Sequence, residues 1–211
     1  GGDSGAIATA NYLARKYCVK SVMPIRFAKK RLESVKDEVF LPTDFDYYSE
    51  ISQKAMYVIK EFADIFEYVG RDEAYLDVTK RTEGNFINAG HLAQQLKNAV
   101  RNSVKLSCTV GVSSNKLVAK IASGFKKPDG LTIISPDKIE SFLEPLPIGT
   151  IPGIGKKTEE KFREMGFHTI SELKKMGFDF DSRTQMYPTI LTTCRQLMNI
   201  LDLEDRSSKL D

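Results

Sequence analysis

The chain has 211 residues, of which 41% are hydrophobic and 28% charged, a composition typical of a soluble globular protein with one large domain or two to three small ones. No apolar run approaches the roughly 20 residues that span a bilayer, which argues against a membrane protein or a membrane partner. The net charge of +3 is too small to require a nucleic-acid partner, although it permits one.

The first quarter of the chain is expected to be mainly helical. Residues 6–17 begin with small residues and continue with Tyr-Leu-Ala-Arg-Lys, which favours a helix, and residues 24–32 predict a second, basic helix. Residues 38–41 predict a short strand that Pro42 ends. Apolar residues then recur at three- and four-residue spacing over 45–62, which predicts an amphipathic helix, with position 43 or 44 as its cap.

Two strands around an acidic tip are expected next, at residues 65–69 and 74–79, with Gly70 and the pair Asp72-Glu73 between them. Successive strand side chains point to opposite faces, so adjacent carboxylates share one ligand only at a bend. A tight hairpin tip beside a glycine supplies that bend. Two carboxylates there suit a hard divalent cation, which prefers oxygen ligands; an ordinary solvated acidic turn is the alternative.

The next elements complete most of an α+β pattern. Leu92, Leu96 and Val100 mark a helix, and apolar residues alternate with polar ones over residues 106–112, which predicts a half-buried strand. The order helix-strand-strand-helix-strand lacks one strand of the ferredoxin-like βαββαβ fold. Either residues 38–41 supply that strand or it lies before residue 1.

From residue 136 the character changes to short helices separated by glycines. Helices are expected at 136–143, 156–165, 171–176 and about 189–203, which together suggest a small, separate helical domain. We find no internal repeat and no low-complexity tract.

Residues 151–158, Ile-Pro-Gly-Ile-Gly-Lys-Lys-Thr, fit a helix-hairpin-helix turn. The glycines let the backbone pack closely, so that N–H groups at the start of the next helix can face an anion. Lys156 and Lys157 add positive charge beside them. Such contacts hold phosphate and carry no sequence information; a plain turn between two helices is the alternative.

Sulfur and imidazole ligands are scarce. The three cysteines, Cys18, Cys108 and Cys194, lie far apart and form no C-x-x-C pair. We therefore expect neither a zinc site nor a disulfide framework, and a reducing cytoplasm as the location. His91 and His168 are isolated, so any metal is expected to sit on carboxylates.

Five stretches, taken together, closely resemble the Y-family (translesion) DNA polymerases, in particular the DinB-like branch, and they occur in that family's order. The matching stretches are residues 8–15, 72–79, 109–116, 127–130 and 151–155. The resemblance covers nearly the whole chain. It implies fingers over residues 1–43, a ferredoxin-like palm over 44–133, and a helical thumb with the start of a linker over 134–211.

The resemblance also implies roles for particular residues. Asp72 and Glu73 would be catalytic palm carboxylates that bind two Mg²⁺ ions, about 3.5–4 Å apart in such sites. The residues implied to contact the incoming dNTP are Thr9, Tyr12, Arg15 and Lys127. The residues implied to hold the DNA backbone are Gly153, Ile154, Gly155, Lys156 and Lys157.

The implied activity is template-directed addition of dNTPs to a primer 3′-OH, with damage bypass in the parent protein. The implied partners are primer-template DNA and a sliding clamp, the latter through a C-terminal part, and the implied state is a monomer. Two rivals remain open. One is a non-catalytic DNA-binding fragment that uses the helix-hairpin-helix, and the other is a cyclase-type palm, which would turn over nucleotide without a template.

The chain departs from the family pattern in three places. The N-terminal palm strand is missing, with its metal-binding carboxylate and the aromatic residue that excludes a ribose 2′-OH, and so is the C-terminal little-finger domain. Residues 44–48, Asp-Phe-Asp-Tyr-Tyr, imitate the missing motif but match the start of the first palm helix. Gly70-Arg71 replaces a serine and an apolar residue, and Arg71 could favour ionisation of the acids or compete with metal for them.

A palm sheet without its first strand exposes an edge. We therefore expect the isolated chain to be poorly soluble or partly unfolded, and it could be inactive alone.

Overall fold

The computed structural model describes residues 5–175, so the helix predicted at about 189–203 lies outside the described residues. The chain divides into two compact units, residues 1–50 and 51–211. Each has hydrophobic clusters of its own. The predicted boundaries between fingers, palm and thumb stay a prediction.

The first unit contains two short helices, α1 (Tyr12–Lys16) and α2 (Ile25–Leu32). The helix predicted over residues 6–17 is wrong in its first half. The Asn11 side chain accepts a hydrogen bond from the Ala14 N–H at 2.8 Å and caps α1. Ile7 is extended instead, because its N–H donates to the Met23 carbonyl oxygen and its carbonyl oxygen accepts from the Val22 N–H, both at 2.8 Å. The basic second helix is confirmed.

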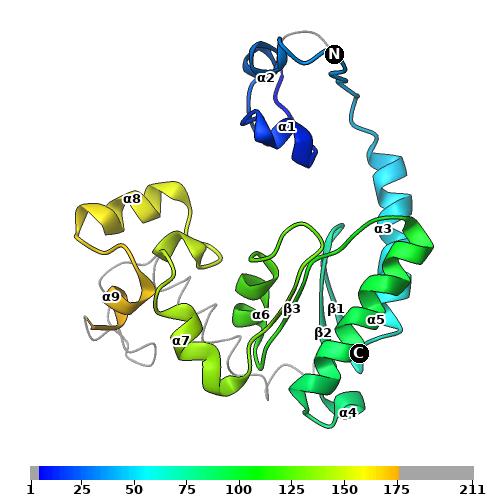
Figure 1. Cartoon of the computed structure of the whole chain (residues 1–211), viewed down its shortest axis with the longest axis vertical. Helices are drawn as coiled ribbons and strands as arrows, with labels where there is room; N and C mark the ends of the chain where they lie inside the picture. Colours follow the sequence, from blue (N-terminus) through cyan, green and yellow to red (C-terminus); the bar gives the residue numbers. More distant parts are fainter. Residues whose placement is uncertain (1–4, 176–211) are drawn as a thin grey trace. The chain divides into compact units, whose positions relative to one another are not determined.

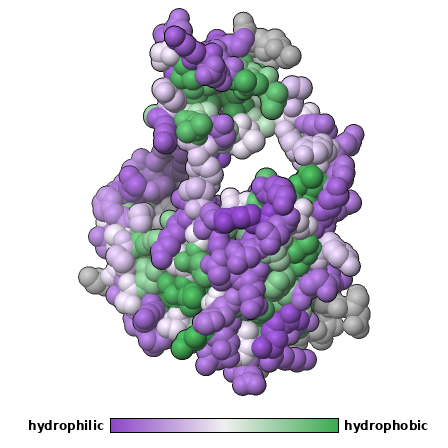
Figure 2. Space-filling model, turned by 45° about the vertical axis from the view of Figure 1, so that its right-hand side comes forward, coloured by the Kyte–Doolittle hydropathy of each residue, from purple (hydrophilic) through white to green (hydrophobic). Residues whose placement is uncertain are grey.

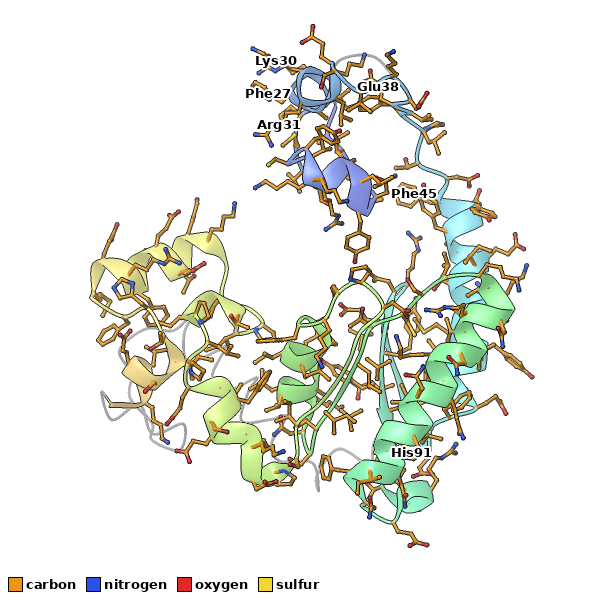
Figure 3. All side chains as sticks on the ribbon, viewed as in Figure 1. Phe27, Lys30, Arg31, Glu38, Phe45 and His91 are labelled. Atoms are coloured by element: carbon orange, nitrogen blue, oxygen red, sulfur yellow. The ribbon has the colours of Figure 1, made fainter. Side chains whose placement is uncertain are left out.

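The strand predicted at residues 38–41 is also wrong. Glu38 lies on the irregular connection between α2 and α3 (Figure 3). Val39 and Leu41 are 75% and 81% exposed, so neither alternate side chain has a core to face, and a strand segment without a partner gains no ladder hydrogen bonds. This segment therefore does not supply the strand that the ferredoxin-like pattern lacks.

The amphipathic helix is confirmed as α3 (Phe45–Lys60), which begins in the first unit and continues in the second. The Asp44 carboxylate accepts a hydrogen bond from the Tyr47 N–H at 2.9 Å. Asp44 is therefore the cap of α3, which explains why an acid stands at the start of a motif that only imitates a metal site.

The second unit contains two small sheets (Figure 1). Strands β1 (Ile65–Gly70) and β2 (Glu73–Asp77) form the predicted antiparallel hairpin. Strands β3 (Val110–Val112) and β4 (Leu131–Ile133) pair in parallel. The strand predicted over 106–112 is shortened to its last three residues, and β4 was not predicted. Within residues 5–175 the two sheets are not joined to each other.

Three helices follow the hairpin: α4 (Thr79–Thr82), α5 (Phe86–Val104) and α6 (Lys116–Ser123). Both α5 and α6 pack against β3 and β4, and the buried face of α5 includes Ala93, Leu96 and Val100. Of the predicted stripe, Leu96 and Val100 are buried and Leu92 is partly buried. A Cβ built on Gly111 would lie 2.5 Å from the Ser123 nitrogen and closer still to the Ala119 carbonyl oxygen. Only glycine lets β3 approach α6 this closely.

The helical region after β4 is confirmed. It consists of two 3₁₀ turns, η1 (Pro136–Lys138) and η2 (Ile148–Thr150), and three helices, α7 (Ile139–Leu143), α8 (Lys156–Glu164) and α9 (Ile170–Lys175). Its buried cluster comprises Ile148, Ile151, Phe162, Ile170 and Leu173. Short helices of this length depend on such a shared core, since alone they would be unstable in water.

The face drawn in Figure 2 is mainly hydrophilic, with patches of hydrophobic residues between the polar ones. Exposed large apolar side chains include Tyr57 on α3 and Ile87 on α5. Among residues 5–175 there is no helix of the length and apolar character that crossing a membrane would need.

Asp64 joins the start of the hairpin to α4. Its carboxylate accepts hydrogen bonds from the Lys80 N–H at 2.8 Å, the Arg81 N–H at 3.1 Å and Arg81 Nε at 2.9 Å. Arg81 also donates to the carbonyl oxygens of Glu61 and Ala63. Burial by itself would raise the pKa of Asp64, but these hydrogen bonds, led by that of the Arg81 side chain, lower the pKa below its usual 3.8.

Acid is therefore expected to loosen this junction. A carboxylate whose pKa is lower in the folded chain stabilises the fold above its unfolded-state pKa, and that contribution is lost as the pH falls through the folded-state pKa. We expect the thermal midpoint to decrease below about pH 4, and the decrease to be smaller in Asp64→Asn, whose side chain does not titrate. Thermal denaturation followed by circular dichroism from neutral to acidic pH measures this. Parallel acid profiles for the two proteins would contradict the assignment.

Candidate functional site

The tip of the β1–β2 hairpin carries the two predicted carboxylates. The pairing passes from Tyr68 opposite Ala74 to Gly70 opposite Glu73, so one residue of β1 is extra and the register shifts there. Such a bulge breaks the strict alternation of side chains. Asp72 lies in the turn and is exposed, while Glu73 begins β2 and is half-buried. The bend that the sequence predicts is thus present.

Helix α3 holds this tip. The Ser52 hydroxyl donates a hydrogen bond of 2.6 Å to the Arg71 carbonyl oxygen, immediately before Asp72. A backbone carbonyl fixed in this way limits the orientations open to the turn. The tip is therefore attached to the long helix as well as to its own strands.

Helix α6 reaches the same hairpin with two lysines one turn apart. Lys116 Nζ donates to the Glu67 carboxylate on β1, and Lys120 Nζ donates to the Glu73 carboxylate on β2. Residues four apart on a helix share one face, so both ion pairs form together. These two lysines therefore neutralise acids of the hairpin.

Tyr75 lies between these charges. Its ring centroid is 5.6 Å from Lys116 Nζ. Burial, and after it the negative charges of Glu73 and Glu67, raise the pKa of Tyr75 above its usual value of 10.0. The phenol therefore stays neutral at physiological pH and adds no charge to the hairpin.

The oxygen ligands at the tip fit a hard divalent cation. Mg²⁺ is commonly held by one or two carboxylates together with substrate phosphates and water, and Asp72 with Glu73 supplies such a pair. No group of three His, Cys, Asp or Glu side chains suited to a metal is found within residues 5–175. His91 is exposed on α5 (Figure 3). That a metal would bind to carboxylates and not to imidazole stays a prediction.

The residues implied to contact a triphosphate fall in both units. In the first unit, Arg15 Nε donates to the Ala10 carbonyl oxygen at 2.9 Å, and its guanidinium carbon lies 5.5 Å from the Tyr12 ring centroid. Thr9 precedes α1 and is exposed. The structure thus brings Tyr12 and Arg15 into contact, and a guanidinium is well suited to phosphate oxygens.

Lys127 belongs to the second unit, on the turn between α6 and β4, and it is exposed. Asp129 in the same turn accepts hydrogen bonds from Lys97, whose side chain is only 5% exposed, and from Arg101. Sequence reasoning missed Lys97. The available signal was its position three residues before Val100, next to the predicted apolar stripe, where a buried lysine is unexpected.

The predicted helix-hairpin-helix turn has the backbone that its glycines allow. Gly153 has a φ of 93°, in the left-handed region that glycine favours. Ile154 packs against the buried cluster, and Gly155 is the residue before α8. Lys156 and Lys157 begin α8 and are exposed. The turn therefore presents a helix N-terminus, with its partial positive charge, beside two ammonium groups.

Comparison with known proteins gives the same picture. Residues 1–124 match the impB/mucB/samB family, and residues 136–167 match the helix-hairpin-helix motif of that family. The chain is 69% identical over 176 residues to a DNA polymerase IV of Nitrosopumilus maritimus, covering 83% of this chain and 48% of the relative. It is 40% identical over 209 residues to DNA polymerase IV 2 of Methanosarcina mazei, covering 99% of this chain and 55% of the relative. The chain thus spans about half the length of these curated relatives.

The fold also matches those of solved polymerase structures. The structure matches a crystal structure of DinB from Sulfolobus solfataricus with a TM-score of 0.80 and 35% identity, covering 96% of this chain and 57% of that one. It matches an insertion ternary complex of Dbh DNA polymerase with a TM-score of 0.79 and 35% identity, covering 95% and 55%. The ferredoxin-like palm class is thereby confirmed. The chain belongs to the impB/mucB/samB family, that is, to the Y-family DNA polymerases of the DinB-like branch.

Proposed function

We propose that this chain carries the catalytic carboxylates of a template-directed DNA polymerase of the translesion type. The observation that supports this most directly is the pair Asp72-Glu73 at a bulged hairpin tip, anchored by Ser52, in a chain of this family. The reaction is attack of a primer 3′-OH on the α-phosphate of a template-paired dNTP, with pyrophosphate as the leaving group. Damage bypass by the whole protein rests on the family resemblance.

The proposed cofactor is Mg²⁺, as two ions held by Asp72 and Glu73. Bound divalent cations would supply Lewis-acid stabilisation to the attacking and leaving oxygens. Glu73 shares its carboxylate with Lys120 in the described structure, so this lysine competes for one ligand. Asp72 is the more accessible of the two and is the residue on which the proposal depends most.

The proposed role of Arg15, Tyr12 and Thr9 is to orient the triphosphate. Arg15 offers a planar fork of donors to phosphate oxygens, and its contact with the Tyr12 ring supports a fixed orientation of the guanidinium. Lys127 would add a single ammonium charge. A sliding clamp as a partner and a monomeric state are further proposals that the family resemblance alone supports. A reducing cytoplasm as the location is a further proposal, based on the small number and wide spacing of the cysteines.

Duplex DNA is the proposed ligand of the helix-hairpin-helix. Replacing Lys156 and Lys157 together by alanine is expected to weaken duplex binding equally for all sequences and to lower the salt slope by about two, since each phosphate contact contributes about one. Fluorescence anisotropy with two unrelated duplexes over a range of salt concentrations measures this. The double variant Lys60→Ala/Lys105→Ala removes the same charge elsewhere. An equal loss in both double variants would contradict a local phosphate site.

The class of activity is tested by supplying nucleotides with and without primer-template DNA in the presence of Mg²⁺. A polymerase extends the primer with the complementary dNTP only. Nucleotide turnover without a template would favour the cyclase-type palm, and duplex binding without extension would favour the DNA-binding module. A chelator is expected to stop extension and to leave duplex binding unchanged.

A further inference from the structure

A buried lysine fixes the turn that carries Lys127. Lys97 Nζ donates three hydrogen bonds, to the Cys108 carbonyl oxygen at 2.7 Å, the Asp129 carbonyl oxygen at 2.8 Å and Asp129 Oδ1 at 2.6 Å. An ammonium has three N–H donors, so each has an acceptor. The side chain is 5% exposed. A buried cation is costly unless it is fully paired, and this geometry meets that condition.

The turn itself has little freedom where these bonds end. Asp129 has a φ of 59°, in the left-handed region that few residues adopt readily. Its carboxylate also accepts from Arg101, one helical turn after Lys97 on α5. A Cβ on Gly130 would overlap Cβ and the carbonyl oxygen of Lys126, so the chain folds back on itself here. Helix α5 thus holds the turn from two successive positions.

The residue that anchors the turn and the residue that the turn presents to solvent are two different lysines. Lys97 is buried and its Nζ donates to Cys108 and Asp129, whereas Lys127, two residues before Asp129, is exposed. Replacing a buried ion pair by apolar residues of similar volume is often neutral or stabilising. Stability alone therefore gives a weak reason for a lysine on the apolar stripe of α5, and control of the turn's geometry gives a stronger one.

We propose that Lys97 is a positioning residue for nucleotide binding, which holds the turn of residues 127–130 so that the Lys127 ammonium meets the triphosphate of the incoming nucleotide. This inference rests on the proposed role of Lys127. Lys97 does not touch the nucleotide. Its effect reaches the substrate through the Asp129 backbone and the short stretch of chain that leads back to Lys127.

The test is a double-mutant cycle in primer extension, carried out on the protein at its full natural length. Lys97→Met is expected to raise the KM for the dNTP about tenfold and to change kcat by less than about twofold, as expected when binding common to ground and transition states is lost. In a Lys127→Ala background, the same Lys97→Met change is expected to add nothing. Lys97→Arg, which keeps a charged donor, is expected to restore the KM to within about threefold.

A merely structural role predicts a different result. Loss of stability would lower the active fraction equally in both backgrounds. A KM increase on Lys97→Met that persists in the Lys127→Ala background would therefore overturn the inference. An unchanged KM on Lys97→Met would overturn it as well. If Lys97→Met does not fold, Asp129→Gly serves in its place. Glycine accepts the φ of 59°, so this change removes the carboxylate without strain. A KM increase of about threefold that vanishes with Lys127→Ala supports the inference, and an unchanged KM overturns it.

Different results would contradict the role of Lys127 and the polymerase function of the protein. A KM unaffected by Lys127→Ala would remove Lys127 from the nucleotide site and overturn the inference, while extension that still depends on Asp72 would leave the polymerase function in place. Absence of templated extension in the unaltered protein would overturn the proposed function itself. Hydrogen exchange of the residue 126–131 amides reports the turn directly. Faster exchange in Lys97→Met, with α5 still protected, is the expected structural result, and unchanged exchange would contradict the anchoring.

Discussion

Replacing Asp72 by alanine is expected to reduce templated primer extension by about a thousandfold or more, with duplex binding changed by less than about twofold. Electrostatic stabilisation by a bound divalent cation contributes several kcal/mol to the transition state, and each 1.36 kcal/mol is a factor of ten in rate. Asp72 is exposed at the hairpin tip and makes no contribution to a buried cluster. Single-turnover extension with excess enzyme, together with duplex binding by anisotropy, measures both quantities.

The matched control is Asp46→Ala. Asp46 belongs to the run that imitates a polymerase acidic motif, yet it lies in the first turn of α3, where it has no place in the proposed site. We expect extension by this variant to stay within about twofold of the unaltered protein, since surface substitutions usually have small effects. Full extension by Asp72→Ala, or a loss of equal size in both variants, would sink the assignment of the hairpin acids.

The hairpin and α3 could be predicted from the sequence because their signals are local. Alternation on both sides of Gly70 predicts two strands and a tip, and apolar spacing from residue 45 predicts one face of a helix. The start of α1 was missed because the Asn11 cap, a single side-chain hydrogen bond, outweighs the helix preference of the small residues before it. An asparagine at this position is itself a sequence signal for the start of a helix.

The sheet pairings depend on more distant information. Strand β4 has only three residues, and it forms because β3, about twenty residues earlier, lies parallel to it. Residues 38–41 have comparable apolar character and form no strand, since nothing pairs with them within the described residues. Strand formation reflects packing against neighbours more than an intrinsic preference, so a single sequence does not separate these two cases.

The candidate site likewise combines residues that a local sequence signal identifies with contacts between distant residues. Adjacency of Asp72 and Glu73 marks the carboxylates directly, whereas the ion pair of Glu73 with Lys120 joins residues 47 positions apart. These two side chains meet because α6, which packs on β3 and β4, also reaches the hairpin with its lysines. The buried position of Lys97 has the same origin, since its acceptors come from two separate stretches of chain. The residue roles taken from the family resemblance, and the expected poor solubility of the isolated chain, stay predictions.

The packing of α6 rests on one glycine, and Gly111→Ala is expected to destabilise the second unit by about 3 kcal/mol, at the upper end of the range for overpacking. The added methyl group would overlap the Ala119 carbonyl oxygen and lie 2.5 Å from the Ser123 nitrogen. Both are backbone atoms of α6, so no side-chain rotation relieves the overlap. The free energy of unfolding from urea denaturation, followed by circular dichroism, measures the change.

Gly70→Ala provides the comparison, because a Cβ at Gly70 meets no heavy atom within 4 Å, and a change below about 0.5 kcal/mol is expected. The Gly111→Ala substitution is also expected to affect the β1–β2 hairpin. If Gly111→Ala forces α6 away from β3, Lys116 and Lys120 move with it, and their ion pairs with Glu67 and Glu73 weaken. A Gly111→Ala protein as stable as Gly70→Ala would mean that α6 does not lie this close to β3, and the pairing of Lys120 with Glu73 would lose its structural basis.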